Sequence, residues 1–387
     1  MTQLHNITDK GNRPFKVLQL GKFYPIRGGV EKVMYDHMLA LSEHGVECDM
    51  LCALSQGESS VLRLNEKARL IGCRTWVKAY ATTLAPSMIV RLFCMKKEYD
   101  LIHVHHPDPM ACVALLLSGY RGKVVLHWHS DIEKQKWLLK LYRPLQRWLI
   151  KRADRIVGTT PVYTAESPCL TDVQQKVRTL PIGIDPVVPQ PEAVERMRSR
   201  YQGRKMVFSL GRMVAYKGFR YLVEAARYLS DDYVVVIGGE GPLRAELEAL
   251  IEYWHLQEKV FLPGRVSDEE LPAYYGACQV FCLSSVQKTE AFGIVQLEAM
   301  SCGKPVVATC IPHSGVSWVN AHGESGLNVP PADARALADA IRTLTEDEAV
   351  YRRYSEGAAQ RYRHLFTREK NLDNLLNIYL ELWESQK

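Results

Sequence analysis

The sequence predicts an α/β protein built from two doubly wound parallel sheets, one in each half of the chain. The length of 387 residues suits two domains of ordinary size. In both halves, short runs rich in Val, Ile and Leu alternate with amphipathic helical stretches, which is typical of βαβ units. A segment rich in proline separates the halves.

The first half contains five predicted strands and one amphipathic helix. Apolar residues recur at helical spacing from Val30 to Leu41, and Gly45 follows as a stop signal. The predicted strands are Lys16–Leu20, Val46–Cys52, Leu101–His105, Val124–Trp128 and Arg155–Gly158.

The second half repeats this pattern. The continuous apolar run Val234–Ile237 favours a strand that is covered on both faces, as in a parallel sheet. The predicted strands are Met206–Leu210, Tyr233–Ile237, Val260–Leu262, Val280–Leu283 and Pro305–Ala308. A helix is predicted over Tyr221–Leu229.

The domain boundary is predicted near residue 187. Residues 181–191 contain four prolines and one glycine, which favours a linker over a helix or strand. We therefore expect an amino-terminal domain at 1–187 and a carboxy-terminal domain at 188–365. The final stretch, 366–387, has one apolar helical face, and we expect it to dock back on the first domain. Ligands of such sheets bind at the carboxyl ends of the strands, so the two domains should face a central cleft.

Composition excludes several classes of protein. Hydrophobic residues make up 47% and charged residues 24%, which excludes a disordered or fibrous chain. No apolar run approaches the roughly 18 residues of a membrane span, and the polar start lacks the features of a signal peptide. The ten cysteines show no CxxC spacing, so neither a zinc site nor a disulfide framework is indicated. We expect a cytoplasmic protein.

Charge is distributed unevenly. Residues 1–190 hold 26 Lys and Arg against 17 Asp and Glu, whereas residues 191–387 hold 23 against 26. Within the basic half, Lys134–Arg152 interleaves basic residues with Trp and Leu, which suits either an anionic membrane surface or a helix packed on its own domain. No motif that reads nucleic acid accompanies the charge, so nucleic acid is not expected as a partner.

Three segments carry residues suited to a phosphorylated ligand. Gly28–Gly29 follow the first strand and open the first helix, where they allow either a tight turn or a close approach to phosphate; their spacing is not the dinucleotide-binding GxGxxG. Arg212 and Lys217 follow a strand and could hold a diphosphate. Glu290 precedes a helix whose first N–H groups would bind an anion, and Glu298 lies further along that helix.

His103, His105 and His106 lie at and just after one predicted strand and could bind a metal. His103 and His105 should point to one face, but no third ligand of fixed spacing accompanies them in the sequence. We expect no metal.

The motifs together resemble the retaining glycosyltransferases of family 4. The pair Glu290 and Glu298, with Phe292-Gly293 between them, resembles the E-x7-E motif of that family. Other matching pieces occur in the family's order over nearly the whole chain: Gly28–Glu31, His129, Gly211-Arg212 with Lys217, Gly238–Pro242, Pro263–Val266 and Gly303–Val307. Two departures are Glu240 in place of the more usual Asp and a longer approach to Glu290 at Val286–Thr289.

The resemblance implies the GT-B fold, with the acceptor on the first domain and a nucleotide sugar on the second. It implies that Arg212 and Lys217 hold the diphosphate, Glu298 the ribose, Glu290 the transferred sugar, and that His129 contacts that sugar near the reacting carbon. The residues it assigns to the donor are Gly28, Gly29, Gly211, Arg265, Val266, Phe292, Gly293, Ile294, Val295 and Glu298, and those it assigns to catalysis are Glu290, His129, Arg212 and Lys217. It implies retention of the anomeric configuration, with the leaving phosphate accepting the acceptor's proton, and neither metal nor cofactor.

The segment His127–Lys136 is similar to that of mannosyl- and rhamnosyltransferases of O-antigen assembly. The expected reaction is therefore mannosyl transfer from GDP-mannose to a lipid-linked saccharide in surface polysaccharide synthesis, with a peripheral location on the inner face of the plasma membrane. UDP-glucose or UDP-N-acetylglucosamine is the alternative donor. An NAD(P)-dependent oxidoreductase and a nucleotide-sugar sensor without activity are alternatives of other classes.

Overall fold

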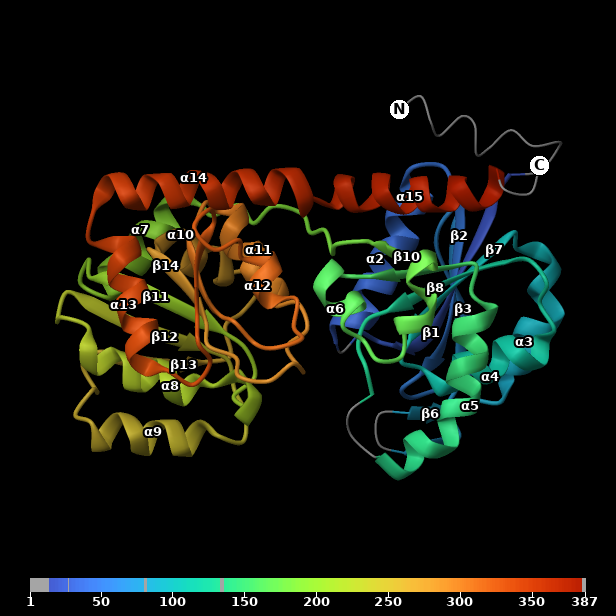
Figure 1. The fold of residues 1–387 in the computed structure, drawn as a ribbon, viewed down its shortest axis with the longest axis horizontal. Coiled ribbons are helices and arrows are strands. Elements are labelled where there is room, and N and C mark those ends of the chain that lie inside the picture. The colour runs from blue at the N-terminus through green and yellow to red at the C-terminus, as the bar shows by residue number, and fades with distance from the viewer. Residues whose placement is uncertain (1–13, 27, 80–81, 133–135, 385–387) are drawn as a thin grey trace. The chain divides into compact units, whose positions relative to one another are not determined.

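The computed structural model describes residues 14–384 except 27, 80–81 and 133–135, and it separates into two compact units. Unit 1 comprises Met1–Ile182 and Asn371–Lys387, and unit 2 comprises Gly183–Lys370. The chain thus leaves unit 1 after Ile182, inside the segment predicted as a linker, and returns to it at Asn371, in the first turn of the final helix. Figure 1 shows the two units with most of their elements labelled.

Unit 1 is built on an eight-stranded sheet of order β10-β9-β8-β7-β1-β2-β4-β3, in which only β3 runs antiparallel to its neighbour. The chain passes from β1 outward to β2 on one side, and later returns to place β7 on the other side of β1. The strands are β1 (Lys16–Tyr24), β2 (Glu47–Leu54), β3 (Ser60–Asn65), β4 (Ala68–Arg74), β7 (Leu101–His106), β8 (Lys123–Trp128), β9 (Arg155–Gly158) and β10 (Val177–Thr179), and a separate hairpin is formed by β5 (Val77–Ala79) and β6 (Thr82–Leu84).

All five strands predicted in the first half are present, but five further strands of unit 1 were not predicted: β3, β4, β5, β6 and β10. β3 is largely exposed, so its sequence has no apolar run that marks a buried strand. β4 begins soon after β3 ends, and β5, β6 and β10 are only three residues long, which is too short to show a periodic pattern.

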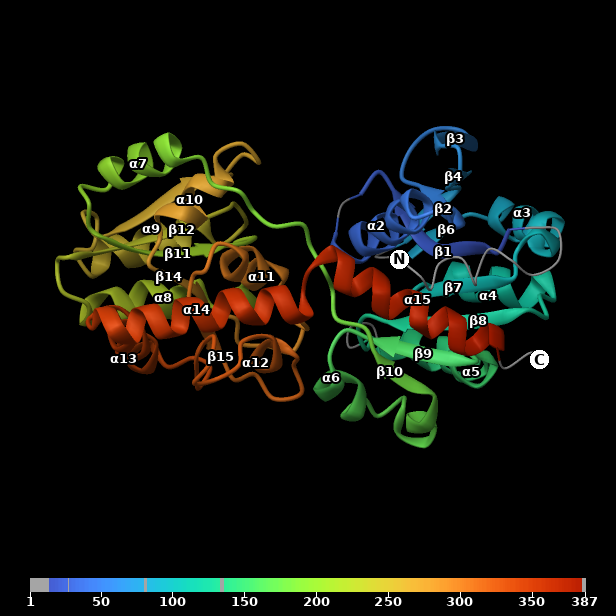
Figure 2. The same ribbon diagram turned by 90° about the horizontal axis from the view of Figure 1, so that it is seen from above.

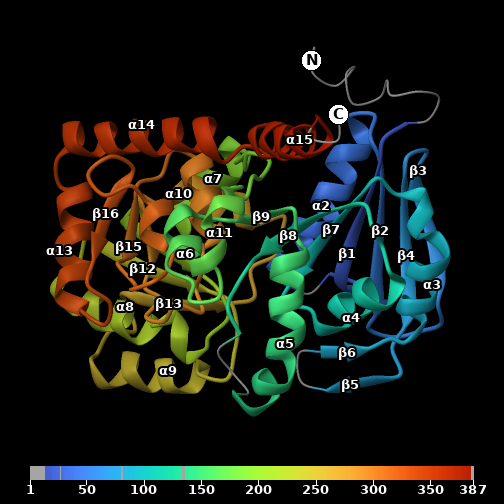
Figure 3. The same cartoon turned by 45° about the vertical axis from the view of Figure 1, so that its right-hand side comes forward.

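Helices cover both faces of this sheet. On one face, α2 (Gly29–Glu43) and α15 (Arg368–Glu384) share a core with β1 and β2, and Figure 2 shows them over the sheet. From α15, Leu372, Leu375, Leu376, Tyr379 and Leu382 are all buried in this core. The remaining helices include α3 (Ser87–Met95), α4 (Pro109–Ser118), α5 (Lys136–Arg152) and α6 (Pro161–Ala165); α4 packs between α3 and α5, as Figure 3 shows.

Unit 2 is built on a six-stranded parallel sheet of order β13-β12-β11-β14-β15-β16. The five strands predicted in this half are present, and β16 was not predicted. The strands are β11 (Lys205–Leu210), β12 (Tyr233–Gly238), β13 (Val260–Gly264), β14 (Val280–Leu283), β15 (Val306–Thr309) and β16 (Gly326–Val329). Because β12 and β13 lie on one side of β11 while β14 to β16 lie on the other, the strand order reverses between β11 and β14.

The sheet of unit 2 is buried between helices. On one face α8 (Phe219–Ala225), α9 (Arg244–Tyr253) and α13 (Ala334–Thr345) share a core with alternate strand residues such as Val235 and Ile237. On the other face lie α10 (Leu271–Ala277) and α11 (Ile294–Ser301), with Phe208 of β11 stacked on Tyr274 of α10. Beside them are α7 (Pro191–Arg200), α12 (Val316–Val319) and α14 (Glu348–Leu365). The helix predicted at Tyr221–Leu229 begins earlier, at Phe219, directly after Gly218, and its α-helical part ends at Ala225, followed by a 3-10 turn at Ala226–Tyr228.

No helix within the described residues combines the length and apolar character needed to cross a membrane.

Candidate active site

The residues predicted to bind the donor in the second half gather at one edge of the unit 2 sheet. All six strands are parallel, so their carboxyl ends meet at this edge. Backbone hydrogen bonds join the loops that follow three adjacent strands: Gly211 N–H donates to Gly238 O at 3.0 Å, and Gly239 N–H donates to Gly264 O at 2.7 Å. The loop after β11 is joined to the loop after β14 by Val286 N–H, which donates to Tyr216 O at 2.8 Å. The predicted donor loops therefore form one continuous surface.

At the centre of this edge, where the strand order reverses, Lys217 and Glu290 form a buried ion pair. Lys217 Nζ lies 2.6 Å from Glu290 Oε2, and the two residues are only 8% and 9% exposed. Ser285 Oγ donates to the same carboxylate oxygen at 3.0 Å. Ser314 Oγ donates to the backbone carbonyl of Glu290 at 2.5 Å, which fixes the loop. The sequence predicts that both residues contact the ligand, with Lys217 as one of the cations that offset repulsion near Glu290, but it does not predict the direct ion pair between them.

Glycine permits the close packing that forms this pair. Gly218 has φ of +64°, and a Cβ added there would lie 2.2 Å from the carbonyl oxygen of Ser284. Only glycine therefore lets the turn after Lys217 pack directly on the end of β14. Ser284 Oγ then donates to Lys217 O at 3.0 Å, so the two loops are held together by side chain and backbone.

The helix α11 begins beside Glu290. Gly293 precedes it with φ of +73°, and Ile294 and Val295 begin its first turn, where backbone N–H groups lack partners within the helix. The side chain of Phe292 does not face a ligand site, because it is buried and its ring packs edge to face on that of Phe366. Only the backbone of Phe292 is therefore available for the anion-binding role that the sequence assigned to this stretch.

Glu298 lies on the same helix, half-buried, and accepts a hydrogen bond from the hydroxyl of Tyr275. Burial raises the pKa of Glu298, whereas the hydrogen bond from Tyr275 opposes that rise. Burial and the nearby carboxylate hold the pKa of Tyr275 well above its ordinary range, so the phenol stays protonated and donates. Tyr275 therefore orients one carboxylate oxygen of Glu298, and the other oxygen can accept hydrogen bonds from hydroxyl groups.

The two arginines of the predicted site are exposed. Arg212 follows Gly211 at the end of β11, and Arg265 follows β13; both side chains reach solvent, and Val266 beside them is half-buried. A Cβ on Gly238 would lie 2.8 Å from Val266, so this side chain packs against the end of β12. The edge therefore carries two cations: the exposed guanidinium group of Arg212 and the buried ammonium group of Lys217, which Glu290 holds in place.

His129, Gly28 and Gly29 belong to unit 1. His129 directly follows β8, and its backbone N–H donates to the backbone carbonyl of His106 at 3.2 Å. Gly28 and Gly29 lie at the start of α2 and are exposed. The strand order of unit 1 reverses between β1 and β7, so all three follow strands at or beside the reversal. A Cβ on Gly28 would lie 2.7 Å from Glu31 Oε2, so the carboxylate of Glu31 occupies the space at this turn.

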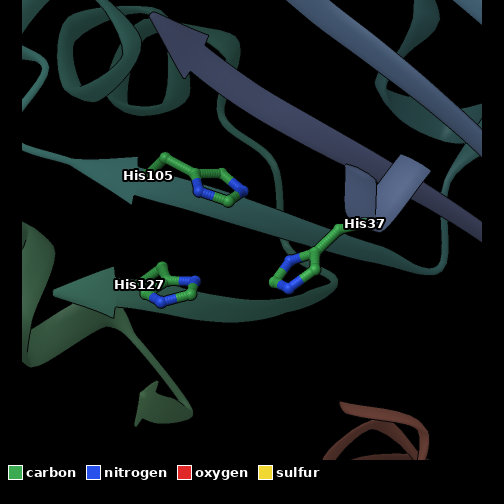
Figure 4. A group of neighbouring side chains, drawn as sticks. All are labelled: His37, His105 and His127. Atoms are coloured by element: carbon green, nitrogen blue, oxygen red, sulfur yellow. The ribbon is translucent and has the colours of Figure 1, made fainter. Parts of the chain in front are cut away.

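His129 adjoins a group of buried histidines, which the sequence revealed only in part. His103 and His105 stack with ring centroids 4.8 Å apart, as their strand spacing predicted, but His106 lies on Trp128 instead. The structure adds His37 from α2 and His127 from β8. Nitrogen atoms of His37, His105 and His127 lie within 4.8 Å of one another, and Figure 4 shows the three rings. These three side chains could hold a metal ion, and the expectation that none is bound stays a prediction.

Sequence reasoning missed five residues of these sites. Tyr275, Ser285 and Ser314 hold the two glutamates in place, and His37 and His127 complete the histidine group. Ser285 and Ser314 follow strands at the same sheet edge, which is the one signal that could have identified them. Tyr275 and His37 lie within helices, where nothing in the local sequence sets them apart.

Overall, the edge of unit 2 combines a fixed ammonium group, an exposed guanidinium, a helix amino terminus and two oriented carboxylates. The cations and the helix terminus suit a diphosphate, and the carboxylates suit hydroxyl groups of sugars.

Comparisons with known proteins agree with this chemistry. Residues 193–361 match the model of the glycosyl transferases group 1, and residues 27–188 match that of glycosyltransferase family 4. The chain is 31% identical to the O-antigen chain mannosyltransferase C of Escherichia coli, covering 96% of this chain and 100% of that one. It is 33% identical to the D-rhamnosyltransferase WbpZ of Pseudomonas aeruginosa, covering 88% of both.

Solved structures show the same fold at low sequence identity. Alr3699/HepE of Anabaena, in complex with UDP, aligns with a TM-score of 0.77 at 19% identity, over 95% of this chain and all of that one. A sucrose-phosphate synthase of Thermosynechococcus elongatus aligns with a TM-score of 0.77 at 22% identity, over 96% and 100%. The chain therefore belongs to the glycosyltransferases of group 1 and family 4, and it has their GT-B fold of two Rossmann-like domains.

Proposed function

We propose that this glycosyltransferase moves a mannosyl group from GDP-mannose to a lipid-linked saccharide in the synthesis of a surface polysaccharide. The buried pair of Lys217 and Glu290 beside the amino terminus of α11 carries this proposal, because it places a cation and a sugar-binding carboxylate together. Two relatives that cover most of the chain bear the names of an O-antigen mannosyltransferase and a rhamnosyltransferase. Membership of the family excludes the oxidoreductase alternative.

The proposed reaction exchanges one bond at the anomeric carbon. The bond from that carbon to the diphosphate oxygen breaks, and a bond to the acceptor hydroxyl oxygen forms on the same face, so the configuration is retained. The acceptor's proton passes to the departing phosphate oxygen. No metal or cofactor takes part in this proposal.

Stabilisation of the departing diphosphate is the main catalytic contribution. Lys217 has three N–H donors, so it can bind Glu290 and a phosphate oxygen at once. Arg212 adds a planar pair of donors from the exposed side, and the backbone N–H groups of Gly293, Ile294 and Val295 add the partial positive charge of a helix terminus. These groups act where negative charge develops during transfer.

The proposal gives each of the other predicted residues a contact with one part of the donor or acceptor. Glu290 accepts hydrogen bonds from hydroxyl groups of the transferred sugar, and Glu298 accepts hydrogen bonds from those of the ribose. Arg265 and Val266 lie beside the base, and Gly211 leaves room for the backbone of its loop to approach the ligand. On unit 1, His129 contacts the transferred sugar, and Gly28 and Gly29 give space to phosphate and acceptor.

We further propose that α5 binds the anionic surface of the plasma membrane on its inner face, where a lipid-linked acceptor resides. Lys140, Arg143, Arg147 and Lys151 are exposed, and Leu141 among them is 81% exposed. A basic helix with an exposed apolar side chain suits a membrane of acidic lipids. Arg152 is excluded from this surface because it binds Asp154 and the carbonyl of Gly122. Lys134, which the sequence included in this helix, lies outside the described residues, and so does Gln135.

The donor can be tested by thermal unfolding with GDP, UDP and NAD⁺. At a hundredfold excess over its dissociation constant, GDP should stabilise the protein by about 2.7 kcal/mol, and UDP and NAD⁺ should not. In Arg212→Ala the shift by GDP should shrink, whereas Arg220→Ala, an exposed arginine on α8, should retain it. Stabilisation by UDP alone would favour UDP-glucose or UDP-N-acetylglucosamine as donor.

The role of Glu290 can be tested by Glu290→Gln. Loss of the carboxylate should lower mannosyl transfer about 100- to 1,000-fold, since an oriented group acting on the transition state contributes on this scale. Transfer is measured as radioactivity passing from labelled GDP-mannose to the lipid extract of bacterial membranes. The matched control is Glu252→Gln, an exposed glutamate of α9, which should remain active. Full activity of a folded Glu290→Gln protein would remove Glu290 from the site.

The membrane proposal can be tested by flotation with liposomes that contain acidic lipid. The protein should float with them at low salt, and joint substitution of Lys140, Arg143, Arg147 and Lys151 by Gln should leave it in the bottom fraction, because the attraction is electrostatic. A control with the same loss of charge substitutes the exposed Arg196, Arg200, Arg363 and Lys370 of unit 2 and should still float. Equal release of both variants would argue against a specific role of α5.

A further inference from the structure

A chain of buried hydrogen bonds runs from β1 to His129 within unit 1. Gln19 Oε1 lies 2.8 Å from His105 Nε2, and His105 Nδ1 lies 2.9 Å from His129 Nε2. Gln19 and His105 have no exposed surface, and His129 is 6% exposed. The chain therefore connects the core of the sheet to the one histidine that the proposed function places against the sugar.

The direction of this chain is set by the amide of Gln19. Its nitrogen donates to the hydroxyl of Tyr379 at 3.3 Å and lies 3.7 Å from the sulfur of Cys48. With the nitrogen so placed, the carbonyl oxygen faces His105 and can only accept. His105 must therefore carry its proton on Nε2.

The rest of the chain follows from the neutral state of the two rings. Both rings are buried, and the hydrogen bonds of this chain join them to an amide and to each other, which gives neither ring a carboxylate to balance a positive charge; each ring therefore carries one proton. Since His105 is protonated on Nε2, its Nδ1 accepts, and His129 must donate from Nε2. His129 is then left with an unprotonated Nδ1.

We propose that Gln19 and His105 are positioning residues that hold His129 in the tautomer whose Nδ1 accepts a hydrogen bond from a hydroxyl group of the transferred sugar. The sugar hydroxyl thus acts as the donor, and a substituent that cannot donate, such as a deoxy or O-methyl position, is rejected there. The contact with the sugar rests on the proposed function, whereas the tautomer rests on the hydrogen-bond chain alone.

The same histidines offer a rival arrangement that the test must separate. His37 Nδ1 and both nitrogens of His127 are buried without hydrogen-bond partners among the described residues. A metal ion on His37, His105 and His127 would need a nitrogen of His105, and both of its nitrogens already serve the chain. A bound metal would therefore break the connection between Gln19 and His129.

The tautomer can be read by NMR of the full chain labelled with ¹⁵N-histidine, since protonated and unprotonated ring nitrogens resonate far apart. We expect His129 to show an unprotonated Nδ1 and a protonated Nε2, with its signals assigned from His129→Gln. Gln19→Leu removes the acceptor and should produce a mixture of tautomers at His129. Gln19→Glu keeps an acceptor at this position and should preserve the wild-type pattern.

Transfer rates provide the second measurement. Gln19→Leu should lower kcat about 10-fold, the effect of one hydrogen bond, with less change in the KM for the donor. Gln19→Glu should recover most of this loss, which a merely structural role of Gln19 would not explain. Leu18→Val, a change in the buried neighbour on β1, should leave transfer near the wild-type rate.

Three results would overturn the inference: a protonated Nδ1 in wild-type His129, an unchanged spectrum in Gln19→Leu, or one equivalent of metal in the purified protein by elemental analysis. Failure of the proposed function would look different. If His129→Gln transferred mannose at the wild-type rate, the sugar contact would be wrong, while the tautomer measured by NMR would stand.

Discussion

The buried ion pair between Lys217 and Glu290 is the interaction on which the candidate donor site depends. Removing two charges from water is costly, and the cost is offset only by close attraction and further hydrogen bonds. Here the nitrogen and oxygen are 2.6 Å apart, and Ser285 adds a hydrogen bond to the carboxylate. Since one residue follows β11 and the other follows β14, the pair holds together the two loops at the reversal of strand order. A charged ligand finds this arrangement already formed.

The pair also reconciles two roles that would otherwise conflict. A carboxylate that binds sugar hydroxyls next to a diphosphate would repel it, and in the proposed complex the ammonium group of Lys217, which contacts Glu290, compensates this repulsion. Glu298 avoids the conflict differently, because it lies further along α11 and is oriented by Tyr275. In unit 1 a buried amide and an imidazole are hydrogen-bonded in a chain to His129, and under the proposal they orient this residue without adding a charge.

Much of the fold was predictable because its strands are buried on both faces. Runs such as Val234–Ile237 identify the central strands, and the proline-rich segment marks the passage between units. The exposed edge strand β3 carries no such signal. The candidate site followed from motifs near strand ends, whereas its internal contacts did not: Lys217 and Glu290 are 73 residues apart in sequence, and their contact depends on which strands are neighbours. The same holds for His37, which meets the strand histidines only through the packing of α2.

The central claim is that a nucleoside diphosphate binds at the edge of unit 2 formed by Arg212, Lys217 and the start of α11. A crystal structure of the protein with GDP tests it most directly. The account predicts density for the diphosphate against Lys217 Nζ and the backbone of Gly293–Val295, with Glu290 retained beside the ammonium group. Density for GDP at any other place, with this edge unoccupied at saturating ligand, would contradict it.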